Sequence, residues 1–177
     1  DPDFAYHVAA AQLWGTMALR LADAAALPFD YTDYAAAIRE YFDESVKLAR
    51  RRHLESAVDQ KSMEDALKNF SDEAARIESE KGRLSVNDNA SAPRLRRIND
   101  ALMSAERAFI DDRGLMGRPW YKHEIYAPGI FTGYASQPLT DFRQALDDRN
   151  STNMKTGLER IVAAINRATE VLKKGME

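Results

Sequence analysis

Residues 109–134 read FIDDRGLMGRPWYKHEIYAPGIFTGY, and the interpretation of the whole chain starts from this stretch. Its glycines and prolines interrupt any continuous helix or strand: Gly114, Gly117, Gly129, Gly133, Pro119 and Pro128. Irregular stretches of this length are uncommon in compact domains and usually serve a function or are disordered. Disordered segments are poor in aromatic residues, whereas this one contains Trp120, Tyr121, Tyr126, Phe131 and Tyr134. We therefore predict an ordered loop laid over a helical scaffold.

The composition bounds the class of protein. The chain has 177 residues, of which 45% are hydrophobic and 30% charged, as in an ordinary soluble protein. One domain of this size buries about 70% of the surface of its unfolded chain, which is enough for a stable core without disulfides or a bound metal. The net charge of −3 provides no basic surface for nucleic acid. Cysteine is absent, which excludes disulfides and thiol chemistry but not a secreted location.

The N-terminal segment combines an unusual start with a long apolar run. The chain begins Asp1-Pro2, with neither an initiator methionine nor a signal peptide, and we expect it to be a piece of a longer protein. Residues 4–27 are nearly apolar but are interrupted by polar positions. The run therefore predicts a buried core helix rather than a membrane span, and no membrane contact by this segment.

Helical periodicity of apolar residues extends over most of the chain. Residues 4–26 form a helix with one thin polar stripe, which predicts a central position covered on several sides. A second helix begins after Thr32 or Asp33 and ends in the basic run 50–52, which we interpret as a solvated end that suits the helix dipole.

Four further helices are expected. They cover residues 62–81, a segment opened by Pro93, a short segment opened by Thr140 or Asp141, and residues 153–174 with Gly175 as the C-cap. Residues 82–93 read as a polar, mobile linker.

The predicted fold is all-α, an antiparallel up-down helix bundle with one long ordered aromatic loop. No convincing strand and no fixed-period repeat is found. The bundle consists mainly of the first, second, fourth and sixth helices, or of the second, third, fourth and sixth with the first packed against them.

Several kinds of catalytic motif are missing. No glutamate precedes a histidine by three positions, as a carboxylate-bridged di-iron bundle requires, and there is no HExxH, GxSxG or phosphate-binding glycine loop. Three scattered histidines do not make a zinc site by their spacing. We expect His7 to be a packed core residue, His53 to lie at the surface and His123 to be structural. The chain by itself is therefore not expected to be a complete enzyme.

Three positions match the N-glycosylation pattern, namely Asn69, Asn89 and Asn150. The pattern is short and weak. Together with the absence of cysteine it gives mild support for a secretory route and leaves a location elsewhere open.

The central stretch resembles a known family. Residues 104–111 read SAERAFID, residues 117–128 read GRPWYKHEIYAP, and a Gly-Tyr pair follows at 133–134. These motifs, with DPDFAYH at 1–7, ALPFDYTDYA at 26–35 and KNFS at 68–71, resemble the C-terminal helical domain of the glutamate carboxypeptidase II family. Its members are zinc exopeptidases related to transferrin receptor. The resemblance covers nearly the whole chain and is specific between residues 106 and 128.

The resemblance implies a role for the whole chain. Residues 1–177 would form a single transferrin receptor-like dimerisation domain that joins two subunits into a homodimer about a two-fold axis. The loop of about residues 110–137 would reach into the upstream protease domain of the same chain and close its substrate pocket. No cofactor is implied for this segment, and zinc is implied for the upstream protease domain. The parent would be an extracellular or membrane-anchored exopeptidase.

The resemblance also implies four pocket positions. Tyr134 falls on a family tyrosine whose hydroxyl binds the α-carboxylate of the substrate, where a charge-assisted hydrogen bond is strong. Gly133 stands where the glutamate-specific enzymes have a lysine, so a preference for glutamate is in doubt. Thr132 replaces a family asparagine. His123 falls on a histidine beside the pocket loop and is given a supporting role.

Three functions remain open at this point. The chain is the dimerisation and pocket-closing domain of a zinc exopeptidase, the matching domain of a non-catalytic receptor, or a free-standing bundle that binds a partner. The retained Tyr134 favours the first, and the glycine at 133 keeps the second open.

Overall fold

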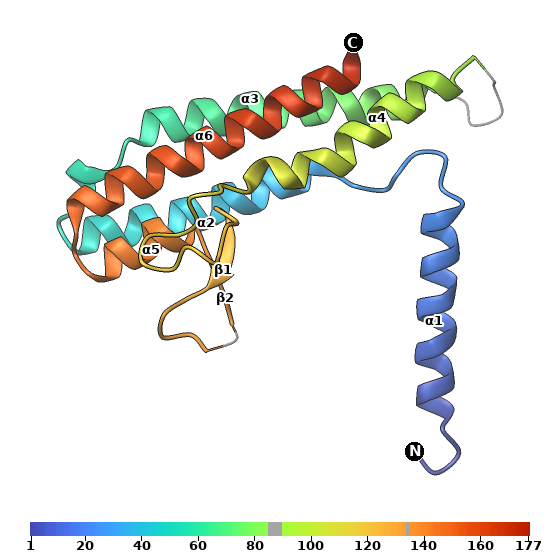
Figure 1. The fold of residues 1–177 in the computed structure, drawn as a ribbon, viewed down its shortest axis with the longest axis horizontal. Coiled ribbons are helices and arrows are strands. Elements are labelled where there is room, and N and C mark those ends of the chain that lie inside the picture. Colours follow the sequence, from blue (N-terminus) through green and yellow to red (C-terminus); the bar gives the residue numbers. More distant parts are fainter. Residues whose placement is uncertain (85–89, 134) are drawn as a thin grey trace.

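Four long helices pack as an antiparallel bundle (Figure 1). The computed structural model describes residues 1–84, 90–133 and 135–177. The bundle helices are α2 (Tyr31–Arg51), α3 (Gln60–Arg83), α4 (Ala92–Ala105) and α6 (Ser151–Met176). They are the second, third, fourth and sixth helices of the sequence, the four that the second predicted arrangement names, but the first helix does not pack against them.

Side-chain caps fix where three bundle helices begin. The Asp30 carboxylate accepts a hydrogen bond from the Thr32 amide at 2.8 Å, and the Asp59 carboxylate accepts one from the Ser62 amide at 3.0 Å. Asn150 likewise caps α6 by accepting from the Asn153 amide at 3.0 Å. First-turn amides have no partner within the helix, so a side-chain oxygen stabilises the start. Each of these helices begins two or three residues before its predicted start.

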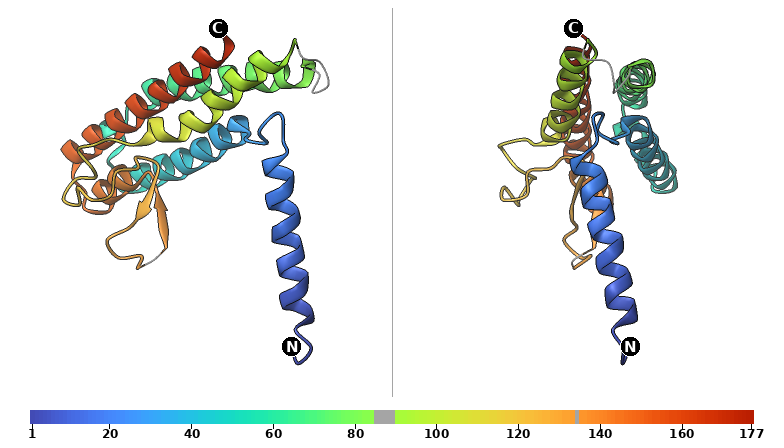
Figure 2. Two further views of the ribbon diagram at one scale, coloured as in Figure 1. Left: turned by 45° about the vertical axis from the view of Figure 1, so that its right-hand side comes forward. Right: turned by 90° about the vertical axis from the view of Figure 1, so that its right-hand side faces the viewer.

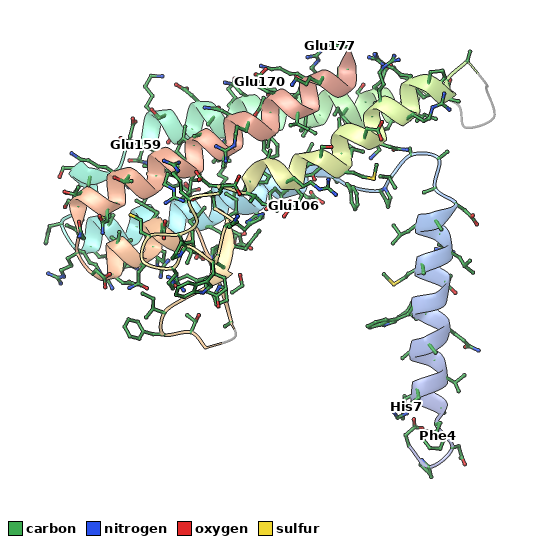
Figure 3. The ribbon with its side chains drawn as sticks, in the orientation of Figure 1. Phe4, His7, Glu106, Glu159, Glu170 and Glu177 are labelled. Atoms are coloured by element: carbon green, nitrogen blue, oxygen red, sulfur yellow. The ribbon has the colours of Figure 1, made fainter. Side chains whose placement is uncertain are left out.

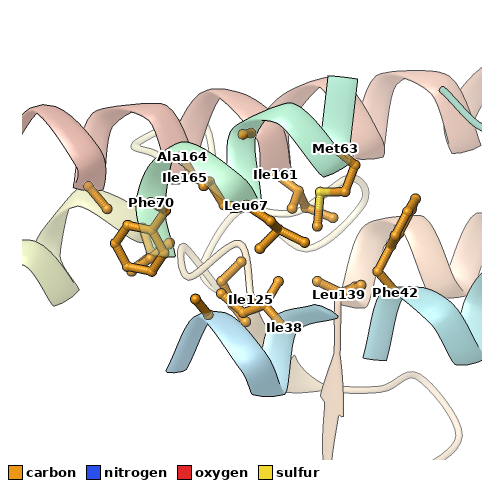
Figure 4. Packing of buried hydrophobic residues seen from close by; sticks show 14 of the residues in the cluster. Ile38, Phe42, Met63, Leu67, Phe70, Ile125, Leu139, Ile161, Ala164 and Ile165 are labelled. Atoms are coloured by element: carbon orange, nitrogen blue, oxygen red, sulfur yellow. The ribbon is translucent and has the colours of Figure 1, made fainter. Parts of the chain in front are cut away.

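The core lies between α2, α3 and α6, closed at one end by α5 (Thr140–Asp147) (Figure 4). Ile38 of α2, Phe70 of α3 and Ile161 of α6 have no exposed surface. Gly157 lets α5 lie directly against α6, because a Cβ there would be 2.9 Å from the Phe142 nitrogen. Burying side chains of this size contributes about 1.5–3 kcal/mol each, so α6 is held on several sides at once.

A short hairpin interrupts the helical pattern. β1 (Tyr126–Pro128) and β2 (Ser136–Pro138) pair antiparallel, with Tyr126 opposite Pro138 and Pro128 opposite Ser136. The prediction that no strand occurs was wrong. Strands of three residues are too short to show an alternating pattern, and both end in a proline, which is tolerated only at edges. Two single-turn 3-10 helices, η1 (Glu55–Ala57) and η2 (Glu106–Phe109), complete the fold.

The first helix does not join the bundle. α1 (Ala5–Ala22) stands away from it as an isolated arm and has no buried residue (Figures 1 and 2). The predicted central position of this helix is therefore wrong for the chain on its own. Its apolar side chains cover most of its circumference, as in a helix surrounded by a core, but the bundle already has four helices and leaves no place for a fifth.

The arm leaves the bundle at a fixed point. The side chain of Asn99 on α4 donates to the Ala25 carbonyl at 2.8 Å and accepts from the Leu27 amide at 2.9 Å. Leu27 itself packs against the core. The link between α1 and α2 is therefore anchored although α1 is not.

Two further predictions need correction. His7 is not a core residue: its side chain is 74% exposed near the free end of α1, and Nδ1 lies 2.7 Å from an Asp1 carboxylate oxygen (Figure 3). Gly175 is not a C-cap, since α6 continues to Met176. A Cβ at Gly175 would lie 2.6 Å from the Ala101 Cβ, so this glycine permits α4 and α6 to pack closely.

The predicted polar linker is shorter than residues 82–93. α3 continues through Arg83 and α4 begins at Ala92, while residues 85–89 lie outside the described part of the chain. Among the residues described, no helix is long and apolar enough to cross a membrane.

Phe70→Ala tests the core. We expect this change to lower the free energy of unfolding by about 3–5 kcal/mol, because the ring packs against Tyr31 and Phe109 and its removal leaves a cavity. Urea unfolding followed by circular dichroism measures the loss. Ser79→Ala, an exposed position on the same helix, should change it by no more than about 0.5 kcal/mol. A loss below about 1 kcal/mol for Phe70→Ala would contradict this packing.

Candidate pocket-closing loop

The loop doubles back on itself after η2. The Glu124 amide donates to the Phe109 carbonyl at 2.9 Å, and the Asp111 amide donates to the Lys122 carbonyl at 2.9 Å. Ile110 and His123 form a bridge between the two arms. These bonds satisfy backbone groups that a disordered segment would leave to water, so the loop is ordered, as predicted.

Glycine shapes the inner turn of the loop. The Leu115 amide donates to the Tyr121 carbonyl at 2.7 Å, closing a turn that contains Gly117 and is preceded directly by Gly114. Both glycines have positive φ, 68° and 74°. A Cβ at Gly114 would lie 2.1 Å from the Pro119 carbonyl oxygen, whereas one at Gly117 would meet no atom within 4 Å. Backbone conformation favours glycine at both positions, but only at Gly114 would a side chain also overlap a neighbouring atom.

A buried cation attaches this turn to the bundle. Arg160, on α6, donates to the Gly114 carbonyl at 2.6 Å and to a Glu124 carboxylate oxygen at 2.6 Å. Its other terminal nitrogen lies 3.4 Å from an Asp141 carboxylate oxygen, and that carboxylate accepts from the Met116 amide at 3.0 Å. We call the side chains of Arg160, Glu124 and Asp141 the Arg160 cluster.

The electrostatics of the Arg160 cluster are set by burial. Burial raises the pKa of the Glu124 carboxyl above its usual range, and the nearby Arg160 guanidinium only partly opposes this. Burial likewise raises the pKa of Asp141, against the hydrogen bond from the Met116 amide and the charge of Arg160. The exposed ion pair of the loop behaves in the opposite way, since the Arg113 side chain lowers the pKa of Asp111.

Aromatic rings support the loop from below. Phe109 contacts the rings of Tyr34, Phe70 and His123, with centroids 5.3–5.9 Å apart. Tyr126 of β1 lies against Tyr34 at 5.9 Å. Such pairs contribute about 0.5–1.5 kcal/mol each beyond their buried area. The first strand of the hairpin is thereby fixed against α2.

His123 connects the helix end to the hairpin. Its Nδ1 accepts from the Tyr126 amide at 3.1 Å, so the proton of the neutral ring is on Nε2, which lies 3.0 Å from a Glu106 carboxylate oxygen. His123 therefore has a bracing position within the loop. Its place beside a pocket stays a prediction.

The hairpin tip carries two of the predicted pocket residues. The Thr132 hydroxyl accepts from the Gly129 amide at 2.8 Å and donates to the Ala135 carbonyl at 2.7 Å, so it holds the tip closed. Gly133 has a φ of 61°, and a Cβ there would meet no atom within 4 Å. Tyr134 lies outside the described residues, so the structure brings together only Thr132 and Gly133, with His123 at the base of the hairpin.

The side chains flanking the tip are exposed and apolar. Phe131 is 87% exposed and Ile130 51%, and Trp120 on the inner turn is 68% exposed. The hairpin and α1 extend from the same side of the bundle (Figures 1 and 2). On α2, α3, α5 and α6, by contrast, no large apolar side chain of the described chain is exposed.

A groove lies between α3 and α6, at the end where η1 joins α3. It encloses about 460 Å³, with Val58, Leu158 and Val162 among its lining residues, and Lys155 and Glu159 also line it. On α6, Val162 lies about 160° around the helix axis from Arg160, because successive residues turn by about 100°. The groove therefore faces away from the loop.

The remaining predicted positions are spread over the bundle. Asn69 is exposed on α3, Asn150 caps α6, and Asn89 lies outside the described residues. His53 is exposed as predicted, and follows α2 with a φ of 59°. The basic run is less free than expected, since Arg52 donates to the Leu146 carbonyl at 2.7 Å. No group of three or more candidate metal-ligating side chains occurs in the part of the chain described.

Comparison with known families covers the loop and three of the four bundle helices. The model of the transferrin receptor-like dimerisation domain family matches residues 58–173, more than half of the chain. The chain belongs to this family. The match begins just before α3 and therefore includes the whole loop and the Arg160 cluster, but neither α1 nor α2.

Individual relatives extend the likeness to almost the full chain. Probable glutamate carboxypeptidase LAMP1 of Arabidopsis thaliana is 37% identical over 182 residues, and probable glutamate carboxypeptidase AMP1 of the same plant is 34% identical over 189. The alignments cover 98% and 99% of this chain but 25% of each relative. An inactive zinc metalloprotease of Schizosaccharomyces pombe is 36% identical over 76 residues, 43% of this chain and 9% of that protein. The chain thus spans about a quarter of the length of the two plant relatives.

Sequence reasoning missed the Arg160 cluster of this dimerisation domain. One signal was present, because Arg160 shares a face of α6 with the small residues Gly157 and Ala164, at spacings of three and four, and both of these are buried. A charge at such a position requires a buried partner. The sequence could not identify the partner, since Glu124 and Asp141 lie 36 and 19 residues away.

Gly114→Ala and Gly117→Ala separate backbone strain from steric overlap. Gly117→Ala should cost about 1 kcal/mol of stability, the price of a left-handed conformation alone. Gly114→Ala should cost about 3 kcal/mol or more, because the new methyl group also overlaps the Pro119 carbonyl. Denaturant unfolding of both variants measures the difference. Equal losses would show that the inner turn relaxes freely.

Proposed function

We propose that this chain is the dimerisation domain of a glutamate carboxypeptidase-like zinc exopeptidase. Its residues 1–177 form one domain that holds two subunits together, and its loop of about residues 110–137 supplies one wall of the pocket for the substrate's C-terminal carboxylate. The observation that carries the proposal is the loop itself. It is ordered through the buried Arg160 and the aromatic cluster, yet its tip is left exposed, as expected for a preorganised surface that another domain completes.

The partner on the loop side is the upstream protease domain of the same chain. The exposed large apolar residues gather on α1, on its link to α2, at the end of α4 and on the loop, and include Trp14, Phe29, Met103 and Phe131. Exposed apolar surface of this extent indicates contact with another domain or another protein. Because α1 is apolar around most of its circumference, it packs within that domain rather than along one face of it.

The partner on the opposite side is a second copy of this chain. The family match indicates a dimerisation domain, and the α3–α6 groove faces away from the loop, so both partners fit at once. Ala163 is exposed beside this groove and allows a neighbouring helix to approach closely. Lys155 and Glu159 give its rim charges of both signs, which suits a self-complementary two-fold contact.

Zinc belongs to the protease domain in this proposal. The described residues assemble no zinc site by themselves, and the ring of His123 is already engaged by Glu106 and the Tyr126 amide. What this chain would supply is the position of the pocket wall. Tyr134 would donate to the substrate's α-carboxylate. The secretory route, the extracellular or membrane-anchored location and glycosylation at Asn69, Asn89 and Asn150 remain proposals that depend on the parent.

Gly133 bears on which substrate the pocket takes. A glycine carries no cation for an acidic side chain, and the space around its Cβ position is open. The neighbouring Ile130 and Phe131 are apolar and exposed. We therefore infer that the pocket accepts a side chain other than glutamate.

The alternative function is the matching domain of a non-catalytic protein. The likeness to an inactive zinc metalloprotease favours it. Dimer formation would be unchanged in that case, but Tyr134 would have no substrate to bind. A stand-alone partner-binding module is a third candidate, in which the exposed α1 would bind the partner.

The first prediction concerns assembly. The 177-residue chain should form a dimer whose mass is stable across a wide concentration range, and Ala163→Arg should convert it to a monomer by placing a large charged side chain beside the α3–α6 groove. Light scattering behind a sizing column measures the mass of each variant.

Ala36→Arg is the matched control. Ala36 is an exposed alanine in the second turn of α2, so this variant should remain a dimer. A dimer that survives Ala163→Arg would exclude the groove as the interface. A monomeric wild-type chain at every concentration would show that assembly requires the upstream domain.

The second prediction concerns the pocket wall. In the full-length parent, Tyr134→Phe should raise KM about tenfold or more, because one hydrogen bond to a charged group is worth about 1.5–3 kcal/mol. The mass of the dimer should not change. Steady-state kinetics with a peptide substrate measures the effect.

Tyr121→Phe is the control for this change, since Tyr121 lies on the inner turn and stacks with Arg118, a contact that phenylalanine retains. It should leave the kinetics as in the wild type. An unaltered KM for Tyr134→Phe would remove this residue from the pocket.

A further inference from the structure

The Arg160 cluster contains more negative than positive charge. One guanidinium faces two carboxylates, Glu124 and Asp141, and all three side chains are buried. When all are ionised, the cluster has one uncompensated negative charge away from water, which is costly. One added proton makes it neutral. We propose that the Arg160 cluster is a proton-linked latch, which fixes the loop of residues 110–137 to α6 in mildly acidic solution and loosens as the pH rises.

The cluster holds the loop on both sides of the hairpin. Glu124 lies two residues before β1, and Asp141 lies three residues after β2. Arg160 binds both and also the Gly114 carbonyl, while Asp141 accepts the Met116 amide. The hairpin that carries Thr132 and Gly133 is thus attached to α6 through one guanidinium.

Oε2 of Glu124 is the atom that would take up the added proton. Oε2 of Glu124 is buried and has no hydrogen-bond partner among the described residues, whereas Oε1 is bound by Arg160. A negative charge on a buried carboxylate oxygen is unfavourable when no hydrogen-bond donor stabilises it. Protonation of Oε2 therefore removes a buried charge without breaking the bond between Oε1 and Arg160.

The surrounding charges favour this assignment. Asp111 of the loop and Asp141 of α5 both act on Glu124 to raise its pKa, in addition to its burial. Arg160 of α6 opposes them, and Arg118 of the loop acts on Asp141. Arg113 is engaged by Asp111. The nearby cations lower the pKa of each carboxyl by less than burial raises it.

The direction of the pH dependence follows from the raised pKa. A carboxyl whose pKa is higher in the latched loop than in the open one takes up a proton on latching. The latch is therefore strongest below the open-loop pKa and weakens as the pH rises through the latched pKa. The latch itself does not depend on the proposed function; only its effect on a pocket does.

Hydrogen–deuterium exchange of the full 177-residue chain between about pH 4.5 and 8 tests the latch, with rates corrected for intrinsic exchange. We expect protection of the Met116 amide to fall as the pH rises, by up to about tenfold for each pH unit between the open and latched pKa values. The amide of Ile161, in the core of α6, is the internal reference and should keep its protection.

Two variants distinguish a latch from an ordinary ion pair. Glu124→Gln keeps the shape and the bond to Arg160 but removes the excess charge, so Met116 should stay protected at every pH. Glu170→Gln, an exposed position on the same helix outside the groove, should behave as the wild type does.

Two results would overturn the proposal. One is wild-type protection at Met116 that does not change with pH. The other is a Glu124→Gln variant that loses protection at every pH and keeps the wild-type slope, which would indicate a plain structural ion pair. The measurement uses no substrate and follows an amide on the loop side, away from the α3–α6 groove, so failure of the proposed function would leave its outcome unaffected.

Discussion

The placement of one buried cation governs the functional half of this molecule. The helices would pack without Arg160, because their apolar stripes suffice to form a core. The loop has no comparable apolar stripe, and its inner turn approaches α6 through polar groups. A guanidinium with several donors in a planar fork can bind a carbonyl and two carboxylates at once. The rest of the loop, including the glycine turn and the hairpin, is arranged around that contact.

The two sides of the bundle differ in what they offer to other proteins. On the loop side, apolar side chains are exposed on separate, projecting elements, as in an incomplete core. The α3–α6 side is a shallow groove with charged residues around an apolar floor, closer in character to a contact between finished surfaces. This division is consistent with a domain that completes one neighbour and binds a copy of itself.

The sequence predicts the helices well because apolar spacing of three and four is a local signal. It predicts the ordered loop from aromatic and glycine content, and the family from residues 106–128. It fails wherever the decisive contact is distant in the chain. The position of α1 depends on which surfaces are present to cover it: its apolar pattern predicts a buried helix, and the structure leaves every residue of α1 exposed. Arg160, Glu124 and Asp141 belong together only after folding, and Gly175 resembles a C-cap until the nearby Ala101 is seen.

The attachment of α1 through Asn99 has a mechanical consequence. A helix of 18 residues extends about 27 Å at a rise of about 1.5 Å per residue, so it acts as a lever whose pivot is the Asn99 side chain together with the packed Leu27. If a domain bound to α1 rotates, the contact at Asn99 transmits the rotation to α4 as a torque. Because α4 packs against α6 through the small residues Ala101 and Gly175, that torque would reach the helix that borders the groove and holds Arg160. A displacement of α1 far from the bundle would thus reach both the groove and the Arg160 cluster through the anchored link at Leu27 and Asn99.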